Sequence, residues 1–259
     1  MITDISPRFL RVWQRNFKVY KKTWLIAFLP NLFEPALFLL AFGAGLGAMV
    51  GALRYQGAEI SYTAFIAPAI VAIAVMQNAF FENTYASFVR MYYQKTFDAM
   101  LATPLSLGDV ITGEIVWGAT KSVIAGALMT AVLIPFGLVA PAGLLLIVPV
   151  SFLGGMAFGS AGMFFTAVSP TIDLFNLPVF LFITPMFLFS GTFFPLENLP
   201  AWAGKFAAFL PLTHLVELLR APFTGKTGAA LWLHALYLVA FTMLFFPLAV
   251  ARMRKRLIK

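Results

Sequence analysis

The chain has 259 residues, of which 61% are hydrophobic and only 11% charged, and its mean hydropathy is +0.90. A water-soluble domain of this length could not bury so much apolar surface, so the composition excludes that class and predicts a membrane protein. The net charge of +8 does not indicate nucleic acid binding, because the basic residues gather at the ends of apolar stretches. The chain has no cysteine, which excludes disulfides and thiolate metal sites.

Residues 6–22 predict an amphipathic helix that lies in the membrane interface. Phe9, Trp13, Phe17 and Tyr20 fall on one face at helical spacing. The opposite face is basic and carries Arg8, Arg11, Arg15, Lys18 and Lys22. Such a face suits the lipids of an anionic cytoplasmic leaflet, and the pattern leaves open whether the helix is a general anchor or a docking surface.

Six apolar stretches of helix length follow, since about 20 residues cross a hydrocarbon core of about 30 Å. The sequence therefore predicts an all-α integral membrane protein with six transmembrane helices. The predicted spans are 24–49, 63–88, 109–137, 143–167, 174–193 and 228–250. Thirteen of the eighteen lysines and arginines then lie on one side, so both termini are predicted to be cytoplasmic.

Two of the segments that connect the spans are predicted to contain helices of their own. The cytoplasmic segment 89–108 predicts a short helix that ends by Pro104, after which Ser106 and Asp109 form a capping box for the third span. The outer segment 194–227 is strongly apolar and predicts a re-entrant helical hairpin between the fifth and sixth spans, because its two helical patterns are too short to cross.

Three ionisable residues fall near the middle of the bilayer: Glu34, Glu82 and Lys121, each about 12–18 Å from the cytoplasmic interface at the rise of an α-helix. Charged groups at that depth are costly and usually pair, so we expect Lys121 to meet Glu82 or Glu34. The pair could be a structural contact that fixes helix packing, or it could lie on a transport path. Both interpretations stay open.

Catalysis by this chain is not indicated. Gly225, Lys226 and Thr227 match the end of a phosphate-binding loop, but Arg220 stands where its first glycine should be, so we expect no ATP binding by this chain. The two histidines, His214 and His234, lack ligand-like spacing with other donors. The remaining acidic candidates are interpreted as a solvated loop residue, a helix cap and a charge near the interface, at Asp98, Asp109 and Glu114 respectively.

Three stretches carry a family resemblance that covers nearly the whole chain: NLFEPALFLLAFGAGLG (31–47), ATPLSLGDVITGEIVWG (102–118) and SGTFFPLENLP (190–200). They resemble ABC-2-type transporter permeases of the type V exporter fold, and most closely the nodulation-factor exporter branch, which is similar to polysaccharide and drug exporter permeases. The resemblance implies one transmembrane domain over 1–259, in a bacterial inner membrane. It also implies a non-catalytic homodimer that pairs with two separate ATP-binding subunits, which hold ATP and Mg²⁺, while this chain holds no cofactor or metal.

The same resemblance implies roles for particular segments. The coupling helix that contacts the ATPase would carry Phe97, Asp98, Leu101, Pro104 and Leu105, and the interface helix beside it Arg8, Arg11, Arg15 and Lys18. The outer gate would include Trp202, Phe206, Leu215 and Leu219. Apolar lining of a route along the dimer interface would come from Phe175, Phe180, Phe182, Phe187 and Phe189.

The implied substrate is an amphipathic molecule: a lipid-linked saccharide, a lipo-oligosaccharide or a lipid-like compound. A drug or antibiotic efflux permease of the same fold is the alternative. A membrane-embedded enzyme acting on lipids and an ion-coupled carrier that works alone are the competing classes.

Overall fold

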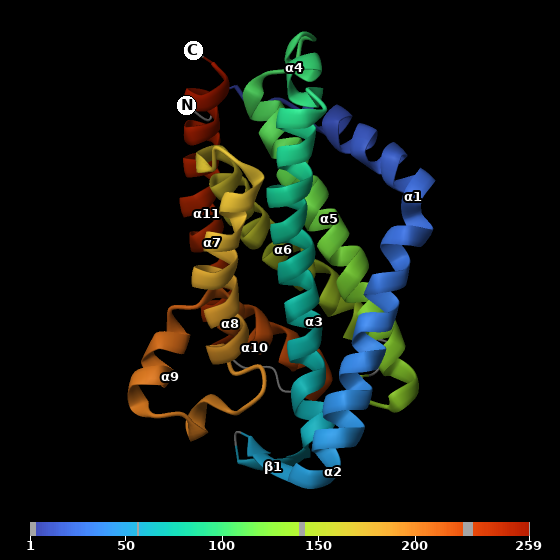
Figure 1. The fold of residues 1–259 in the computed structure, drawn as a ribbon. Coiled ribbons are helices and arrows are strands. Elements are labelled where there is room, and N and C mark those ends of the chain that lie inside the picture. The colour runs from blue at the N-terminus through green and yellow to red at the C-terminus, as the bar shows by residue number, and fades with distance from the viewer. Residues whose placement is uncertain (1–3, 56, 140–142, 225–229, 259) are drawn as a thin grey trace.

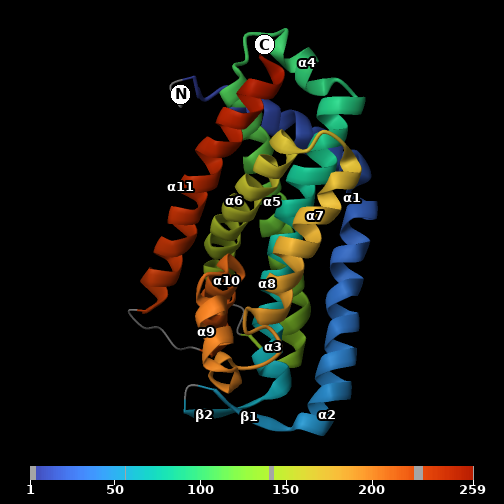
Figure 2. The ribbon, with the colours of Figure 1, turned by 60° about the vertical axis from the view of Figure 1, so that its left-hand side comes forward.

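The structure is a computed structural model that describes residues 4–55, 57–139, 143–224 and 230–258. Within these ranges it does not describe the side chains at 26–28, 30–32, 34–36, 39, 44, 224 and 230. The described chain is a helical bundle with one small β-hairpin (Figures 1 and 2).

Five helical stretches of the described residues are long and apolar enough to cross a membrane. They correspond to the second to sixth predicted spans, with shifted ends. The first two are α3 (Tyr62–Phe81) with η2 (Glu82–Ala86) and η3 (Val89–Tyr93), and α5 (Leu107–Leu133) with η4 (Ile134–Phe136). The others are α6 (Gly143–Val168), the run of η5 (Ile172–Phe175), α7 (Asn176–Pro178), η6 (Val179–Ile183) and α8 (Thr184–Phe189), and α11 (Ala230–Leu257).

The N-terminal helix is continuous where the sequence predicts a separate interface helix and first span. Helix α1 (Phe9–Phe38) continues into η1 (Leu39–Leu46) and α2 (Gly47–Val50). Its first part crosses one end of the bundle and the rest descends along the bundle (Figure 1). The predicted span 24–49 lies on this helix, and Glu34 is among the side chains that are not described.

A β-hairpin that the sequence did not predict follows α2. Strands β1 (Ala52–Tyr55) and β2 (Ala58–Ser61) pair antiparallel, with Leu53 opposite Ile60. Gly57 in the turn has a φ of +77°, which is the left-handed region that favours glycine. The architecture is therefore helical with one hairpin instead of purely α.

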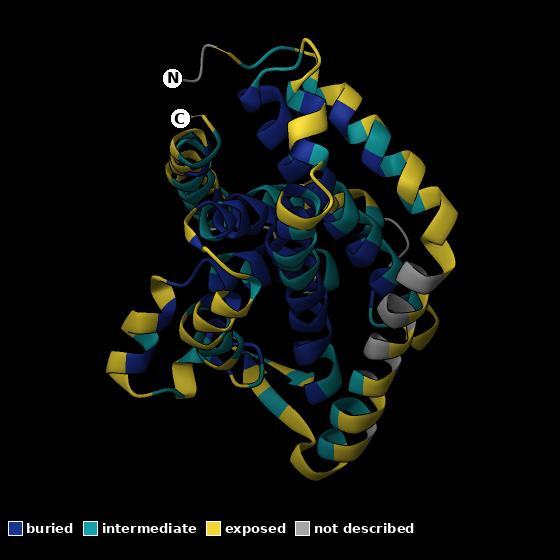
Figure 3. Cartoon of the chain, turned by 45° about the horizontal axis from the view of Figure 1, so that its top comes forward, coloured by how far each residue is buried: buried dark blue, intermediate teal, exposed yellow. Residues whose placement is uncertain are grey.

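Close helix approach at small residues holds α5 against α6. A Cβ added at Gly155 of α6 would lie 2.6 Å from the Cα of Ala119 on α5, so only glycine allows this contact. Helix α3 is buried on nearly every side and forms the centre of the bundle, whereas exposed residues follow the N-terminal helix (Figure 3). Helix α5 also contacts α1 and α3, so these three helices are neighbours.

The two ends of the bundle differ. Both termini and the short helix α4 (Thr96–Leu101) lie at one end, and the β-hairpin lies at the other with η7 (Leu196–Asn198) and α9 (Ala201–Ala208) (Figures 1 and 2). Helix α9 meets α10 (Pro211–Thr224) at 84°, so the pair is a broken span or a re-entrant segment. The two short helices are as predicted, and their path in the membrane stays a prediction.

Candidate functional site

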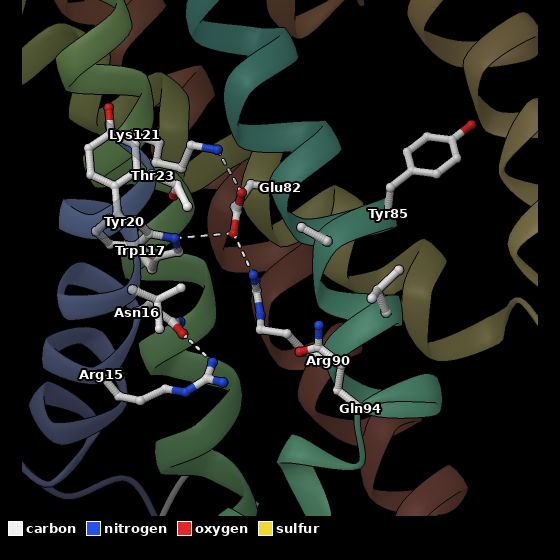
Figure 4. A pocket seen from close by; sticks show the side chains of 13 residues that line it. Arg15, Asn16, Tyr20, Thr23, Glu82, Tyr85, Arg90, Gln94, Trp117 and Lys121 are labelled. Atoms are coloured by element: carbon white, nitrogen blue, oxygen red, sulfur yellow. Dashed lines mark hydrogen bonds and ion pairs between the residues drawn. The ribbon is translucent and has the colours of Figure 1, made fainter. Parts of the chain in front are cut away.

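A charged cavity of about 490 Å³ lies between α1, the continuous helix α3–η3 and α5 (Figure 4). Its lining includes Arg15, Asn16, Glu82, Arg90 and Lys121. A second hollow of about 300 Å³ shares Glu82 and Lys121 with it and adds Gln77 and Asn78. The site is therefore polar and charged although it is built from apolar spanning helices.

Glu82 is the first centre of this cavity, and its side chain is 6% exposed. Its Oε2 lies 2.8 Å from Lys121 Nζ, and its Oε1 lies 2.8 Å from an Nη atom of Arg90. The indole N–H of Trp117 donates a hydrogen bond to the same Oε1 at 3.1 Å. Pairing of Lys121 with Glu82 is one of the two arrangements that the sequence left open, and the alternative partner, Glu34, has no described side chain.

Glu114 is the second centre of the charge network; it is completely buried and lies behind the residues that line the cavity. It accepts hydrogen bonds from Arg90 Nη2 at 2.5 Å and from Arg90 Nε at 2.9 Å. Ser87 Oγ and Asn16 Nδ2 each donate to it at 2.8 Å. Arg90 thus bridges two carboxylates on α5 and η2, and Asn16 ties α1 to them.

The sequence predicts neither the burial of Glu114, which was interpreted as a charge near the interface, nor the helical position of Arg90, which falls in the predicted connecting segment 89–108. The π-helical turns η2 and η3 extend the second span to Tyr93, so Arg90 lies on a helix that faces α5. Each turn of this kind inserts a residue into the helical repeat and rotates the side chains that follow it. One signal of this pairing is visible in the sequence, namely a glutamate and an arginine near the ends of adjacent predicted spans.

Charge in the cavity is nearly balanced. Glu82 at the cavity wall and Glu114 behind it pair with Arg90 and Lys121. Arg15, which donates a hydrogen bond of 2.8 Å to Asn16 Oδ1, adds a further positive charge at the wall. Buried charges are tolerated when they are paired and hydrogen-bonded, as these are. The arrangement can hold a polar or anionic group at its rim. Across the described residues, no three carboxylate or histidine side chains could hold a metal ion together.

The aromatic face of α1 packs on α5. The rings of Trp13 and Tyr20 lie 6.5 Å and 5.5 Å from that of Trp117, and Trp13 Nε1 donates a hydrogen bond to Thr120 at 2.9 Å. On the predicted polar face, Arg8, Arg11 and Lys18 are exposed, but Arg15 is partly buried and lines the cavity.

Helix α4 supplies the predicted short helix, but only part of the predicted contact surface. Asp98 and Pro104 are exposed, and Leu101 and Leu105 are partly buried. Phe97 is completely buried in a cluster with Phe88, Ile111 and Met253. Phe97 thus anchors α4 to the bundle in this conformation, and its contact with an ATPase stays a prediction.

The predicted capping box of the third span is confirmed. Ser106 Oγ accepts a hydrogen bond from Asp109 N at 3.0 Å, and Asp109 Oδ2 accepts one from Ser106 N at 3.1 Å. Asp109 also accepts a hydrogen bond of 2.6 Å from the backbone N–H of Ser6. Ser6 is thus tied to α5, and α1 begins at Phe9, within the predicted range 6–22.

Replacing Asp109 by alanine should lower the free energy of unfolding by about 1–2 kcal/mol, because the cap of α5 and the tether to Ser6 are both lost. Thermal unfolding in detergent measures the effect. Asp98→Ala is the matched control, since Asp98 is an exposed aspartate nearby and should leave the midpoint unchanged. An unaltered midpoint for Asp109→Ala would contradict the role of the cap.

The predicted gate residues divide into two environments. Trp202 and Phe206 of α9 are exposed, whereas Leu215 and Leu219 of α10 are fully buried in the core. Phe175 is also fully buried, so it lines no surface in this conformation. The phosphate-loop-like residues 225–227 lie outside the described residues.

The sequence is similar to a known protein family and to known proteins over most of its length. The family model described as ABC-2 type transporter matches residues 7–224. Nodulation protein J of Rhizobium leguminosarum bv. viciae is 41% identical over 250 residues, which are 96% of this chain and 95% of that protein. Nodulation protein J of Rhizobium meliloti (strain 1021) is 38% identical over 248 residues, 96% and 93% of the two chains. The inner membrane transport permease YadH of Escherichia coli (strain K12) is 23% identical over 235 residues, 91% and 90% of the two chains. A family match of this extent, on a helical bundle of spanning length, means that the chain belongs to the ABC-2 type transporter family of membrane permeases.

Proposed function

We propose that the chain is the permease subunit of an ATP-driven ABC exporter in a bacterial inner membrane. Two copies form the transmembrane part, and two separate subunits bind ATP and Mg²⁺ and hydrolyse the nucleotide. The substrate is an amphipathic molecule of the lipo-oligosaccharide or lipid-linked saccharide class, as the resemblance to the nodulation-factor exporter branch implies. Efflux of a drug or antibiotic by the same fold is the alternative.

One observation carries the proposal: α4 projects at the end of the bundle that holds both termini (Figure 1). The buried side chains of Phe97 and Met100 anchor α4 to the bundle, while Asp98 and Pro104 are exposed and accessible to a partner. The same end carries the basic termini, so the positive-inside rule favours a cytoplasmic position. A short, firmly anchored and exposed helix on that side suits docking of a cytoplasmic ATPase.

A chain of contacts links the α4 segment to α1. Arg8 Nη1 donates a hydrogen bond of 2.6 Å to the carbonyl oxygen of Pro104, and Ser106 Oγ donates one to the carbonyl oxygen of Asp4. Movement of α4 on a hydrolysing ATPase would thus pull on α1, which is one wall of the charged cavity. We infer that this is how the nucleotide cycle reaches the cavity.

The cavity suits the polar part of an amphipathic substrate. Arg15 and Lys121 present positive charge at its wall, and the next turns of α1 expose apolar side chains at Leu25, Leu29 and Phe33. A headgroup could rest in the cavity while its acyl chain stays beside α1 in lipid. On this proposal Glu82, Arg90 and Glu114 hold the wall in shape, and Arg15 meets the substrate.

Purification of the intact chain in mild detergent from its native host tests the proposal. We expect an ATP-binding protein at equal stoichiometry, and an ATPase activity of the complex that a lipo-oligosaccharide stimulates more than a hydrophobic drug does. Stronger stimulation by the drug would favour the alternative. Recovery of the chain alone, with substrate turnover or ion-gradient-driven uptake after reconstitution, would contradict the proposal and favour the enzyme or carrier class.

A further inference from the structure

The two histidines of the chain meet at the end of the bundle opposite the termini. His214 lies on α10 and His234 on α11, and their Nδ1 atoms are 2.8 Å apart. The other nitrogen of His214, Nε2, is 2.9 Å from the carbonyl oxygen of Ala208. Both rings therefore take part in one hydrogen-bonded chain that joins the bent pair α9–α10 to the last spanning helix.

The acceptors of these two hydrogen bonds determine which ring nitrogens carry a proton. A carbonyl oxygen only accepts hydrogen bonds, so Nε2 of His214 must carry a proton. A neutral His214 then has a lone pair on Nδ1, and Nδ1 of His234 must be the donor to it. A neutral His234 in this tautomer has a lone pair on Nε2. The two rings must therefore be in opposite tautomers.

We propose that the His214–His234 pair is a binding site for one proton that fastens α10 to α11. A proton that binds Nε2 of His234 leaves the Nδ1–H of that ring in place, and the resulting imidazolium donates a stronger, charge-assisted hydrogen bond to His214. A second proton has no free position, because Nδ1 of His214 already accepts that bond. Two protonated Nδ1 atoms at 2.8 Å would repel each other.

Aromatic and acidic side chains surround the pair. The ring of Tyr237 on α11 stacks on His214 with centroids 3.8 Å apart. A cavity of about 270 Å³ beside the pair is lined by Glu217 of α10, Glu197 of η7 and Tyr55 of β1, together with both histidines.

Glu217 is the charged group that faces the pair most directly. Its Oε2 accepts a hydrogen bond of 2.6 Å from Tyr55, and its Oε1 lies 2.5 Å from an Nη atom of Arg220. These two partners hold the carboxylate in the cavity, where it attracts an imidazolium. Burial and Glu217 both raise the pKa of Tyr55, so its hydroxyl stays a donor. Acidification at this end should thus strengthen the attachment of α10 to α11.

Nitrogen NMR of the full chain labelled with ¹⁵N-histidine tests this directly, because only two residues give signals. In alkaline buffer we expect one ring protonated on Nε2 and the other on Nδ1. On acidification one ring should become an imidazolium while the other stays neutral, so the pair takes up one proton. Two rings with the same tautomer, or uptake of two protons by the folded protein, would overturn the proposal.

Substitution of one histidine provides the matched control. In His214→Phe, whose side chain has no hydrogen-bond acceptor, His234 loses the lone pair that fixes its tautomer, so its signal should move to the ordinary Nε2–H form. In His234→Gln, His214 should keep its proton on Nε2, because Ala208 still accepts from it. If either variant fails to fold, the titration of the unaltered chain still decides the question. The readout does not depend on transport, so its outcome is separate from that of the proposed function.

Discussion

Replacing Glu114 by leucine should lower the yield of folded protein several-fold and destabilise it by about 3–5 kcal/mol, the usual effect of removing one partner of a buried ion pair. Glu114 is completely buried and pairs with Arg90. Without it, Nε and Nη2 of Arg90 lose their carboxylate acceptor inside the bundle. Ser87 and Asn16 lose their acceptor as well. Thermal unfolding in detergent and the monodisperse fraction in size-exclusion chromatography measure the loss.

The double variant Arg90→Met with Glu114→Leu separates pairing from simple loss of a side chain. Apolar replacement of both partners often restores much of the stability that one replacement removes, so the two effects should not add. Glu82 then keeps Lys121 as its partner. Arg15→Gln is a control within the same cavity, because Arg15 is partly exposed and should change stability little. Additive losses in the double variant would contradict the network.

The apolar runs allowed the helical spans to be predicted, because their length alone separates them from connecting segments. The same reasoning could not place Arg90. Its position depends on η2 and η3, and a π-helical turn in the middle of an apolar helix leaves no periodic signal. Glu114 lies 24 residues further along, on another helix. Their contact follows from the register of two packed helices, which sequence spacing does not give.

The sequence analysis missed two other features, the β-hairpin and the contact between the histidines, and predicted a third, the capping box. Short segment 52–61 carries few strand-forming residues, so the β-hairpin rests on a glycine turn and on packing against the bundle. His214 and His234 are 20 residues apart on two helices, so no sequence motif indicates that they are in contact. The capping box of Ser106 and Asp109 was predictable, because all its atoms lie within one helical turn.

Phe97 shows a limit of a different kind. A short amphipathic helix with an apolar residue in its first turn can press that residue on a partner or on its own bundle, and the sequence is the same in both cases. The structure turns Phe97 inward and Asp98 outward. The two neighbours thus become separate probes of stability and of docking.

Substitution of Phe97 and of Asp98 should have opposite consequences. Phe97→Ala is expected to destabilise the bundle by about 3–5 kcal/mol, because it empties a completely buried ring site. Asp98→Arg should leave thermal unfolding unchanged and reduce recovery of the ATP-binding subunit, and ATP-driven transport, at least tenfold. Reversal of charge at an interface imposes repulsion on whatever complementary charge the partner presents. Copurification from the native host and transport in vesicles measure both losses.

Asp173→Arg is the matched control, since Asp173 is an exposed aspartate that follows α6 and lies outside α4. If this variant retains the ATP-binding subunit while Asp98→Arg loses it, the contact belongs to α4 and not to the net charge of the chain. Equal recovery of the subunit with Asp98→Arg would mean that docking uses another surface, and the coupling role of α4 would be withdrawn. A Phe97→Ala protein that stays stable but no longer binds its ATPase would have a different meaning. Phe97 would then have to leave the buried cluster with Phe88 when the partner binds, so that its ring packs on the ATPase instead of in the core.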